Sequence, residues 1–295
     1  MFGQEPAVAA VARAVQRAAA GLSSRRGPLA TLLFVGPTGT GKTELARALA
    51  RELGGAERLV RVDCSEFAGA HETAKLLGAP PGYVGHEQGS VLARRLAGAA
   101  TGETVVLFDE LEKAHGKLHE LLLQILDEGR LTDGRGRELD FRRSFVLLTS
   151  NAGTREREGS RARLGFERAA SDARLEQTVD EALRRTFAPE FLGRIDEIVH
   201  FRELSGRDLC AVATQALLEL AVRVRAGEQR VCFTSAVARW AAEGAEGARE
   251  GARAILHRIR RELEGPLAER LLAAEPGEWI EVSIRAGQPH FAHVT

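Results

Sequence analysis

The pattern of hydrophobic residues along the chain predicts short buried strands that alternate with amphipathic helices. Apolar residues recur at helical spacing at 5–20 and again at 118–126. Uninterrupted apolar runs, typical of strands buried on both faces, lie at 31–35, 59–62, 104–108 and 144–149, and a last strand is expected near residue 198. This alternation predicts the α/β fold class, with a parallel sheet covered by helices on both faces.

The pattern changes at about residue 203, where helices begin to dominate. Helical stretches are expected around 208–224 and 252–272, with short strands at 231–234 and 279–284. A chain of 295 residues has room for about two domains. We therefore expect a large nucleotide-binding α/β domain at 1–202 and a smaller, mostly helical domain with short strands at 203–295.

A glycine-rich loop connects the first predicted strand to the helix that follows it. Its sequence, GPTGTGKT at 36–43, has the strand before it and the helix after it that a P-loop requires. Glycines let backbone N–H groups approach a polyphosphate, and the start of the helix adds its positive dipole. Lys42 is expected to reach the β- and γ-phosphates, and the Thr43 hydroxyl to ligate Mg²⁺. The residues predicted to bind ATP here are Gly36, Pro37, Thr38, Gly39, Thr40, Gly41, Lys42 and Thr43.

Candidate catalytic residues follow two further strands. Asp109 and Glu110 end the strand at 104–108, where Asp109 can hold Mg²⁺ and Glu110 can take a proton from the attacking water. Asn151 follows the strand at 144–149 and is expected near the γ-phosphate, although an Asx turn would equally explain an asparagine there. Hydrolysis also needs further positive charge for the transition state, and composition alone cannot choose among so many arginines.

Composition limits the possible partners and the cellular compartment. The chain is 44% hydrophobic and 28% charged with a formal net charge of zero, so we expect no specific nucleic-acid partner. No apolar run is long enough to cross a bilayer, and the first residues do not resemble a signal peptide. Three cysteines without metal-ligand spacing indicate reduced thiols. We therefore expect a cytoplasmic protein that does not bind membranes.

Seven motifs follow one another along the chain: GPTGTGKTELARALA at 36–50, DCSEF at 63–67, GAPPGYVG at 78–85, LFDELEKAH at 107–115, LLQILDEGRLTDGRGR at 122–137, TSNAG at 149–153 and PEFLGRIDEIV at 189–199. Together they resemble the second ATPase module of the Clp/Hsp100 unfoldases, a branch of the AAA+ ATPases. The resemblance runs from Phe2 to roughly Leu272. It implies an AAA+ fold that binds ATP and Mg²⁺ between a large and a small domain. Whether the chain is a natural stand-alone protein or an excised module is left open.

The resemblance also implies roles for particular residues. Phe2 and Gly3 would lie against the adenine, and Asn151 would be sensor 1. Arg194 would be an arginine finger that reaches the γ-phosphate of a neighbouring subunit, which implies a homo-oligomeric ring, expected to be a hexamer. Tyr83 and Val84 would belong to a pore loop that grips a translocating polypeptide, a task that suits an aromatic side chain because it contacts any unfolded chain by area.

The sensor 2 arginine has two candidates, because Gly-Ala-Arg occurs twice, at 247–249 and 251–253. Counting back from the EGPLA block at 264–268 favours Arg253. Arg249 stays open, since the proline that usually follows this motif in the family is replaced by Ala254. Gly193 likewise replaces the asparagine that commonly precedes the finger arginine.

An apolar tripeptide at 164–166 bears on the partner of the proposed ring. Leu164, Gly165 and Phe166 sit where the ClpC and ClpA branches carry the loop that docks on the ClpP protease, which ClpB-type disaggregases lack. A loop that packs on its own domain would explain the same residues. The functional prediction is an ATP-driven unfoldase and translocase that feeds a ClpP-type protease. The alternatives are a protease-independent disaggregase and a nucleotide-switched assembly or scaffold ATPase.

Overall fold

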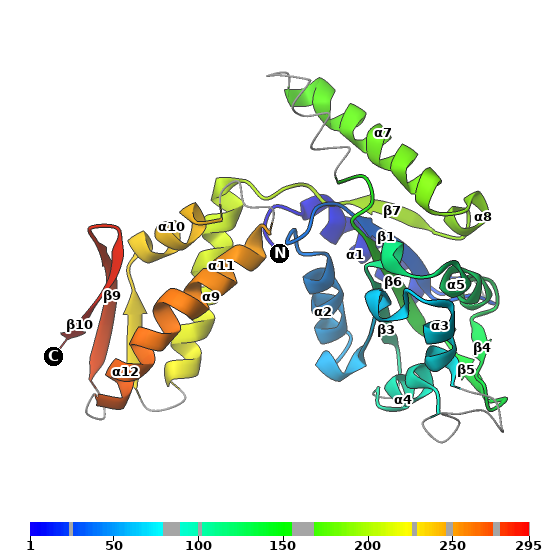
Figure 1. Ribbon diagram of the computed structural model, residues 1–295, viewed down its shortest axis with the longest axis horizontal. Coiled ribbons are helices and arrows are strands. Elements are labelled where there is room, and N and C mark those ends of the chain that lie inside the picture. The colour runs from blue at the N-terminus through cyan, green and yellow to red at the C-terminus, as the bar shows by residue number, and fades with distance from the viewer. Residues whose placement is uncertain are drawn as a thin grey trace. The chain divides into compact units, whose positions relative to one another are not determined.

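In the computed structural model the chain forms two compact units (Figure 1). It describes residues 1–23, 26–78, 89–99, 102–154, 168–225, 229–245, 250–273 and 278–294. The larger unit contains Glu5–Gly36 and Lys42–Phe201; the smaller contains Met1–Gln4, Pro37–Gly41 and Arg202–Thr295. The assignments of Tyr83, Val84, Leu164, Gly165, Phe166 and Arg249 fall outside the described residues and remain predictions.

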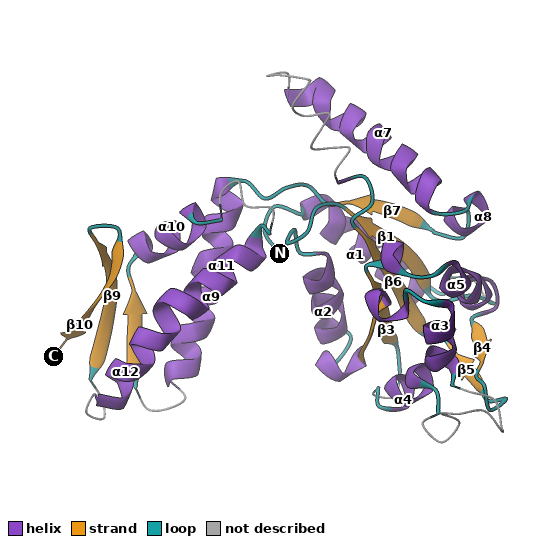
Figure 2. Ribbon diagram, viewed as in Figure 1, coloured by secondary structure: helices purple, strands orange, loops and turns teal. Residues whose placement is uncertain are grey.

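The larger unit is built on a five-stranded sheet with the order β2-β3-β6-β1-β7 (Figure 2). Every neighbouring pair in it is parallel. All five predicted strands are confirmed, and the sheet places β6 between the strand that leads into the glycine-rich loop and the strand that ends in the acidic pair. The strands are β1 (Ala30–Val35), β2 (Leu59–Asp63), β3 (Thr104–Asp109), β6 (Ser144–Ser150) and β7 (Glu197–His200).

Helices and one hairpin complete this unit. The predicted helices at 5–20 and 118–126 are confirmed, whereas α3 and α4 were not predicted because they flank a stretch rich in proline and glycine. Strands β4 (Arg130–Thr132) and β5 (Glu138–Asp140) pair as an antiparallel hairpin. The helices are α1 (Glu5–Ala19), α2 (Lys42–Glu52), α3 (Ala70–Leu77), α4 (Val91–Ala97), α5 (Gly116–Glu128), α7 (Arg168–Thr186) and α8 (Pro189–Leu192).

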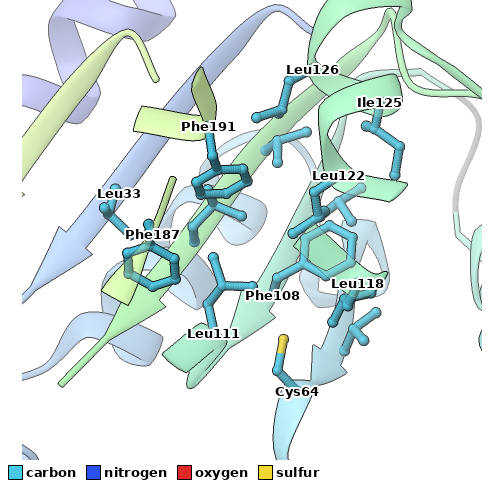
Figure 3. Close-up of a cluster of buried hydrophobic side chains, with 14 of the residues drawn as sticks. Leu33, Cys64, Phe108, Leu111, Leu118, Leu122, Ile125, Leu126, Phe187 and Phe191 are labelled. Atoms are coloured by element: carbon cyan, nitrogen blue, oxygen red, sulfur yellow. The ribbon is translucent and has the colours of Figure 1, made fainter. Parts of the chain in front are cut away.

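The central strands are apolar throughout because both faces of the sheet are covered. Leu33 and Phe108 point into a cluster formed with side chains from α5, α7 and α8 (Figure 3). Leu32 and Phe34 belong to a second cluster, which includes side chains from α1 and α2. Each large side chain buried in this way contributes about 1.5–3 kcal/mol relative to exposure. Two-sided burial therefore explains why the sequence shows continuous apolar runs rather than strict alternation.

The smaller unit packs helices against a three-stranded sheet with the order β10-β9-β8. Its helices are α9 (Gly206–Arg225), α10 (Ser235–Glu243), α11 (Ala252–Ile259) and α12 (Gly265–Ala273), and a π-helical stretch, Arg260–Glu264, joins the last two. This confirms the helical regions expected at 208–224 and 252–272. Strands β8 (Arg230–Phe233) and β9 (Trp279–Arg285) were predicted, but β10 (Gln288–Val294) was not.

The remaining sequence predictions concern membranes and thiols. Among the helices that the structure describes, none combines the length and the apolar character needed to span a bilayer. Cys64, Cys210 and Cys232 are all free, as expected. Burial raises the pKa of the Cys64 thiol, so this side chain is a packing residue rather than a reactive thiolate.

Candidate functional site

The sheet topology brings the predicted nucleotide-binding and catalytic residues of the larger unit to one edge. Parallel strands all present their carboxyl ends on the same side, and ligands of such sheets bind there. Strand β1 runs into Gly36, β3 ends at Asp109, and β6 leads into Asn151. We call the six residues gathered at this edge the carboxyl-end cluster: Lys42, Thr43, Asp109, Glu110, Thr149 and Asn151.

Lys42 is held in place by groups from two strand ends. It is the first residue of α2 and only 7% exposed. Its Nζ donates to the Gly36 carbonyl oxygen at 2.6 Å and to Asn151 Oδ1 at 2.8 Å. A buried ammonium requires such acceptors. The structure thus brings together the loop lysine and the asparagine after β6, both of which the sequence places near the γ-phosphate.

Asp109 is the most densely bonded carboxylate of the cluster. It is 5% exposed, and its Oδ1 accepts hydrogen bonds from Thr149 Oγ1 at 2.6 Å and Thr43 Oγ1 at 3.3 Å. Its Oδ2 accepts from Arg61 Nε at 3.0 Å and Nη2 at 2.8 Å. A buried carboxylate is tolerated only with such compensation. The structure thus brings Thr43 and Asp109 together, as the sequence predicted, and adds two partners that it did not.

Glu110 turns out of the strand in a left-handed backbone conformation, with φ at 58°. This conformation is unfavourable for a non-glycine residue by about 1–2 kcal/mol. It is held by Thr149, whose Oγ1 accepts the Glu110 N–H at 2.9 Å while donating to Asp109. The Glu110 carboxylate pairs with Lys113 at 2.5 Å, and this hydrogen bond raises the pKa of Lys113.

Asn151 is oriented by a second acidic residue after β3. Its backbone N–H donates to Glu112 Oε1 at 3.1 Å, while its side-chain Oδ1 accepts a hydrogen bond from Lys42 Nζ. Glu112 therefore fixes the position from which the Asn151 amide reaches the loop lysine. Sequence reasoning missed this residue, although its place in the motif at 107–115 was a usable signal.

Gly39, a loop glycine that belongs to the smaller unit, is required by its surroundings. Gly39 has φ at 73°, and a Cβ there would lie 1.8 Å from the Glu250 carbonyl oxygen. The Gly39 carbonyl accepts a hydrogen bond from the N–H of Ala252, the first residue of α11, at 3.1 Å. The segment before α11 therefore lies directly against the loop, which only glycine permits at this position.

The N-terminal segment is tied to the same loop by Gln4, which is almost fully buried. The Gln4 side chain donates to the Thr40 carbonyl at 3.3 Å and to the Arg202 carbonyl at 2.8 Å. Thr40 Oγ1 in turn donates to the Pro37 carbonyl at 2.8 Å.

Glycine is required at position 3 because the Asp208 side chain of the same unit lies close to its backbone. It has φ at 68°, and a Cβ there would meet the Asp208 carboxylate at 2.5 Å. The neighbouring Phe2 is 40% exposed.

The two predicted arginines are exposed. Arg194 follows α8 through Gly193, and its N–H donates to the Phe191 carbonyl at 3.1 Å. Its guanidinium pairs with Asp127 near the end of α5, and this hydrogen bond raises the pKa of Arg194. Arg253 is the second residue of α11.

The oxygen atoms of the cluster fit the chemistry of Mg²⁺. The Thr43 hydroxyl lies 3.2 Å from Asp109 Oδ2, so one ion could reach both. Mg²⁺ is usually bound by one or two carboxylates together with substrate phosphates, not by a full protein cage. In keeping with this, the described part of the chain holds no group of three or more histidine, cysteine or acidic side chains arranged for a metal.

Comparisons with known proteins agree with the motifs. A family model described as AAA domain (Cdc48 subfamily) matches residues 27–198, and one described as the C-terminal, D2-small domain of ClpB protein matches residues 204–282. The "ATP-dependent Clp protease ATP-binding subunit ClpC" of Staphylococcus saprophyticus is 39% identical over 288 residues, which cover 96% of this chain and 35% of the relative.

Relatives named as chaperones are equally similar. "Chaperone protein ClpB 2" of Parasynechococcus marenigrum is 44% identical over 293 residues, covering 97% of this chain and 31% of the relative. "Chaperone protein ClpB" of Meiothermus ruber is 42% identical over 290 residues, covering 97% of this chain and 33% of the relative. The chain spans about a third of the length of these relatives.

Proposed function

Because the chain belongs to the AAA ATPase family, as a second ATPase module of the Clp/Hsp100 type, we propose that it hydrolyses ATP to unfold and move polypeptides through a ring. Family membership carries nucleotide binding and ATP hydrolysis in general; the polypeptide substrate and the ring are our proposal. The observation that supports it most is the convergence of Lys42, Asp109 and Asn151 at one sheet edge.

Each member of the carboxyl-end cluster has a role in this proposal. Lys42 binds the β- and γ-phosphates. Thr43 and Asp109 would hold Mg²⁺, which would neutralise charge on the phosphate oxygens. Glu110 accepts the proton of the attacking water after its carboxylate leaves Lys113. Asn151 orients the γ-phosphate or the water while Glu112 holds its backbone.

We propose further nucleotide contacts for residues outside the carboxyl-end cluster. Phe2 and Gly3 contact the adenine, and the loop residues Pro37–Gly41 direct backbone N–H groups at the phosphates. Arg253 serves as sensor 2, supported by the hydrogen bond between Gly39 and its neighbour Ala252. Arg253→Ala should weaken hydrolysis, whereas an effect of Arg249→Ala alone would assign sensor 2 to Arg249.

We place the domain boundary at 202/203 and the protein in the cytoplasm.

Arg194 acts in trans, so the working form is a homo-oligomeric ring, which we propose to be a hexamer. Its exposure and its ion pair with an equally exposed Asp127 support this role, because such a pair is weak and easily exchanged. The test is ATP turnover per subunit over a protein dilution series, with Glu110→Gln as the blank. Turnover that rises to a plateau supports the ring, and turnover independent of concentration contradicts it.

Polypeptide translocation depends on Tyr83 and Val84. Tyr83→Ala should abolish protein unfolding while ATP turnover is retained. The alternative is a nucleotide-switched scaffold, which does not translocate polypeptide. Its function would not change with this substitution. Unfolding of a fluorescent substrate protein separates the two functions.

The relatives include both an ATP-binding subunit of a Clp protease and ClpB chaperones, so a protease partner is a separate proposal. We propose that Leu164, Gly165 and Phe166 dock on a ClpP-type protease. Deleting the three residues should abolish protease-dependent degradation and spare ATP turnover. Degradation that survives the deletion would favour a disaggregase that works without a protease.

A further inference from the structure

Arg61 lies on β2 and reaches across to the carboxylate at the end of β3. The two strands pair in parallel with Arg61 opposite Leu107 and Asp63 opposite Asp109. Side chains two residues apart on a strand share a face, so Arg61, Asp63 and Asp109 all project from the same side of the sheet. Both Nε and Nη2 of Arg61 contact Asp109 Oδ2, at 3.0 and 2.8 Å.

The Asp109 carboxylate has no acceptor capacity left in this arrangement. A carboxylate offers about four lone-pair sites, and four donors are present: the Thr149 and Thr43 hydroxyls and two nitrogens of Arg61. A cation that approaches this carboxylate must therefore displace at least one of them. Two positive groups on one oxygen would also repel each other.

Arg61 is the partner best able to leave. Thr149 is buried in β6, and its hydroxyl also holds the Glu110 N–H, whereas the Arg61 side chain is 43% exposed. A second carboxylate is already close, because Asp63 Oδ2 lies 3.7 Å from Arg61 Nη2. Arg61 can thus move from Asp109 to Asp63 without losing an ionic partner.

We propose that Arg61 is a displaceable counter-ion of Asp109, which neutralises this carboxylate in the metal-free protein and gives way when a divalent cation binds with the nucleotide. The inference rests on the proposed nucleotide site. Arg61 stabilises the metal-free state, because it supplies positive charge to a buried carboxylate. It also lowers the affinity of the site for metal, since binding includes the cost of moving Arg61.

The test is a titration with Mn²⁺ as the probe in the presence of saturating ADP, with free Mn²⁺ measured by electron paramagnetic resonance. Arg61→Gln should lower the Mn²⁺ dissociation constant about tenfold, roughly the factor expected when one charge-assisted hydrogen bond no longer competes. Arg142→Gln is the matched control, because Arg142 pairs with the exposed Asp140 away from the site. It should leave the dissociation constant unchanged.

Thermal unfolding in EDTA supplies a readout that does not depend on metal. Arg61→Gln should lower Tm by about 2–4 °C, the shift expected when a domain of this size loses one favourable interaction. If it does not fold, Arg61→Lys keeps the charge without the two-nitrogen contact and should show a smaller change in the same direction.

An unchanged or weaker Mn²⁺ affinity in the Arg61 variant would overturn the proposal, because Arg61 would then not compete with the metal. Failure of the proposed nucleotide site itself would give a different result. In that case the wild-type protein would not bind Mn²⁺ with ADP, or Asp109→Asn would bind it as well as the wild type.

Discussion

The carboxyl-end cluster and Arg194 belong to the same unit but differ in how they are held. Lys42, Asp109 and Thr149 are buried and joined by hydrogen bonds that run from β1 through β6 to β3. Arg194 is exposed on the turn after α8, and its guanidinium pairs with an equally exposed aspartate. One set is fixed by the fold, and the other is presented to solvent.

This difference suits the separate roles that we propose for the carboxyl-end cluster and for Arg194. Groups that bind phosphate and metal need fixed positions, which burial and shared hydrogen bonds provide. A group that completes the site of another copy has to be accessible until that copy arrives. We therefore expect substitutions in the cluster to affect stability and chemistry in each chain, and substitution of Arg194 to affect only the chemistry of the assembly.

The largest expected effect is that of Arg194→Ala. Loss of an arginine finger reduces phosphoryl-transfer rates by about 10³–10⁵-fold, so steady-state ATP turnover should fall by about that factor. Binding of a fluorescent ADP analogue and the midpoint of urea unfolding should stay at wild-type values. Arg185→Ala, an exposed arginine on α7, is the control and should leave all three unchanged. If the Arg194 variant no longer binds nucleotide, Arg194 does not act only on the chemistry of the assembly, and the contrast with the carboxyl-end cluster is wrong.

Glu110→Gln should have the next largest effect on turnover. The amide cannot accept a proton, and general-base catalysis contributes about 10²–10⁴-fold. ATP should still bind, because Lys42 and Asp109 are untouched. Single-turnover hydrolysis and equilibrium ATP binding measure the two quantities separately. The control is Glu44→Gln, in an exposed ion pair on α2, which should behave as wild type. Near-normal hydrolysis by the Glu110 variant would show that Glu110 is not the general base.

Thr149→Val should produce a smaller effect, on stability. Valine has nearly the same shape but leaves Asp109 and the Glu110 N–H each without one partner. Unpartnered buried groups cost about 1–3 kcal/mol, so the free energy of unfolding in urea should fall by that amount. Thr132→Val, at an exposed position of β4, should change it little. Equal stability of the two variants would show that Thr149 does not hold the cluster together.

The smallest effect concerns pH. His119 packs against Phe187 and Phe191, and burial lowers the pKa of His119. The unfolded chain therefore binds more protons than the folded chain as the pH falls below about 6.5, the ordinary histidine value. Stability should decrease with acidity in that range.

His119→Gln should flatten the pH dependence, as measured by urea midpoints between pH 5 and about pH 7.5. His257→Gln, at an exposed position of α11, should retain the wild-type dependence. If both variants behave alike, another group is responsible for the acid sensitivity.

The sequence was sufficient to predict the sheet and the residues at its carboxyl edge. Strands buried on both faces leave long apolar runs, and phosphate chemistry requires particular residue types at their ends, as Lys42 and Asp109 illustrate. Their proximity then follows from parallel strands sharing one edge.

The sequence could not supply the partners of those residues. Arg61 is one of many arginines, since all but four of the 41 basic residues are arginine, and only strand register places it beside Asp109. Thr149 lies within a predicted strand, where a threonine usually signifies β-propensity. Strand β10 was missed because its proline and polar residues obscure it, although an edge strand tolerates both.

Mixing two inactive variants tests the central claim most directly. Chains carrying Arg194→Ala and chains carrying Glu110→Gln are combined in equal amounts, and ATP turnover is compared with that of each variant alone. If Arg194 acts in trans, the mixture should recover roughly a quarter of wild-type turnover, the share of interfaces in a randomly mixed ring at which an intact Glu110 meets an intact Arg194. A mixture no more active than its two components would contradict the account.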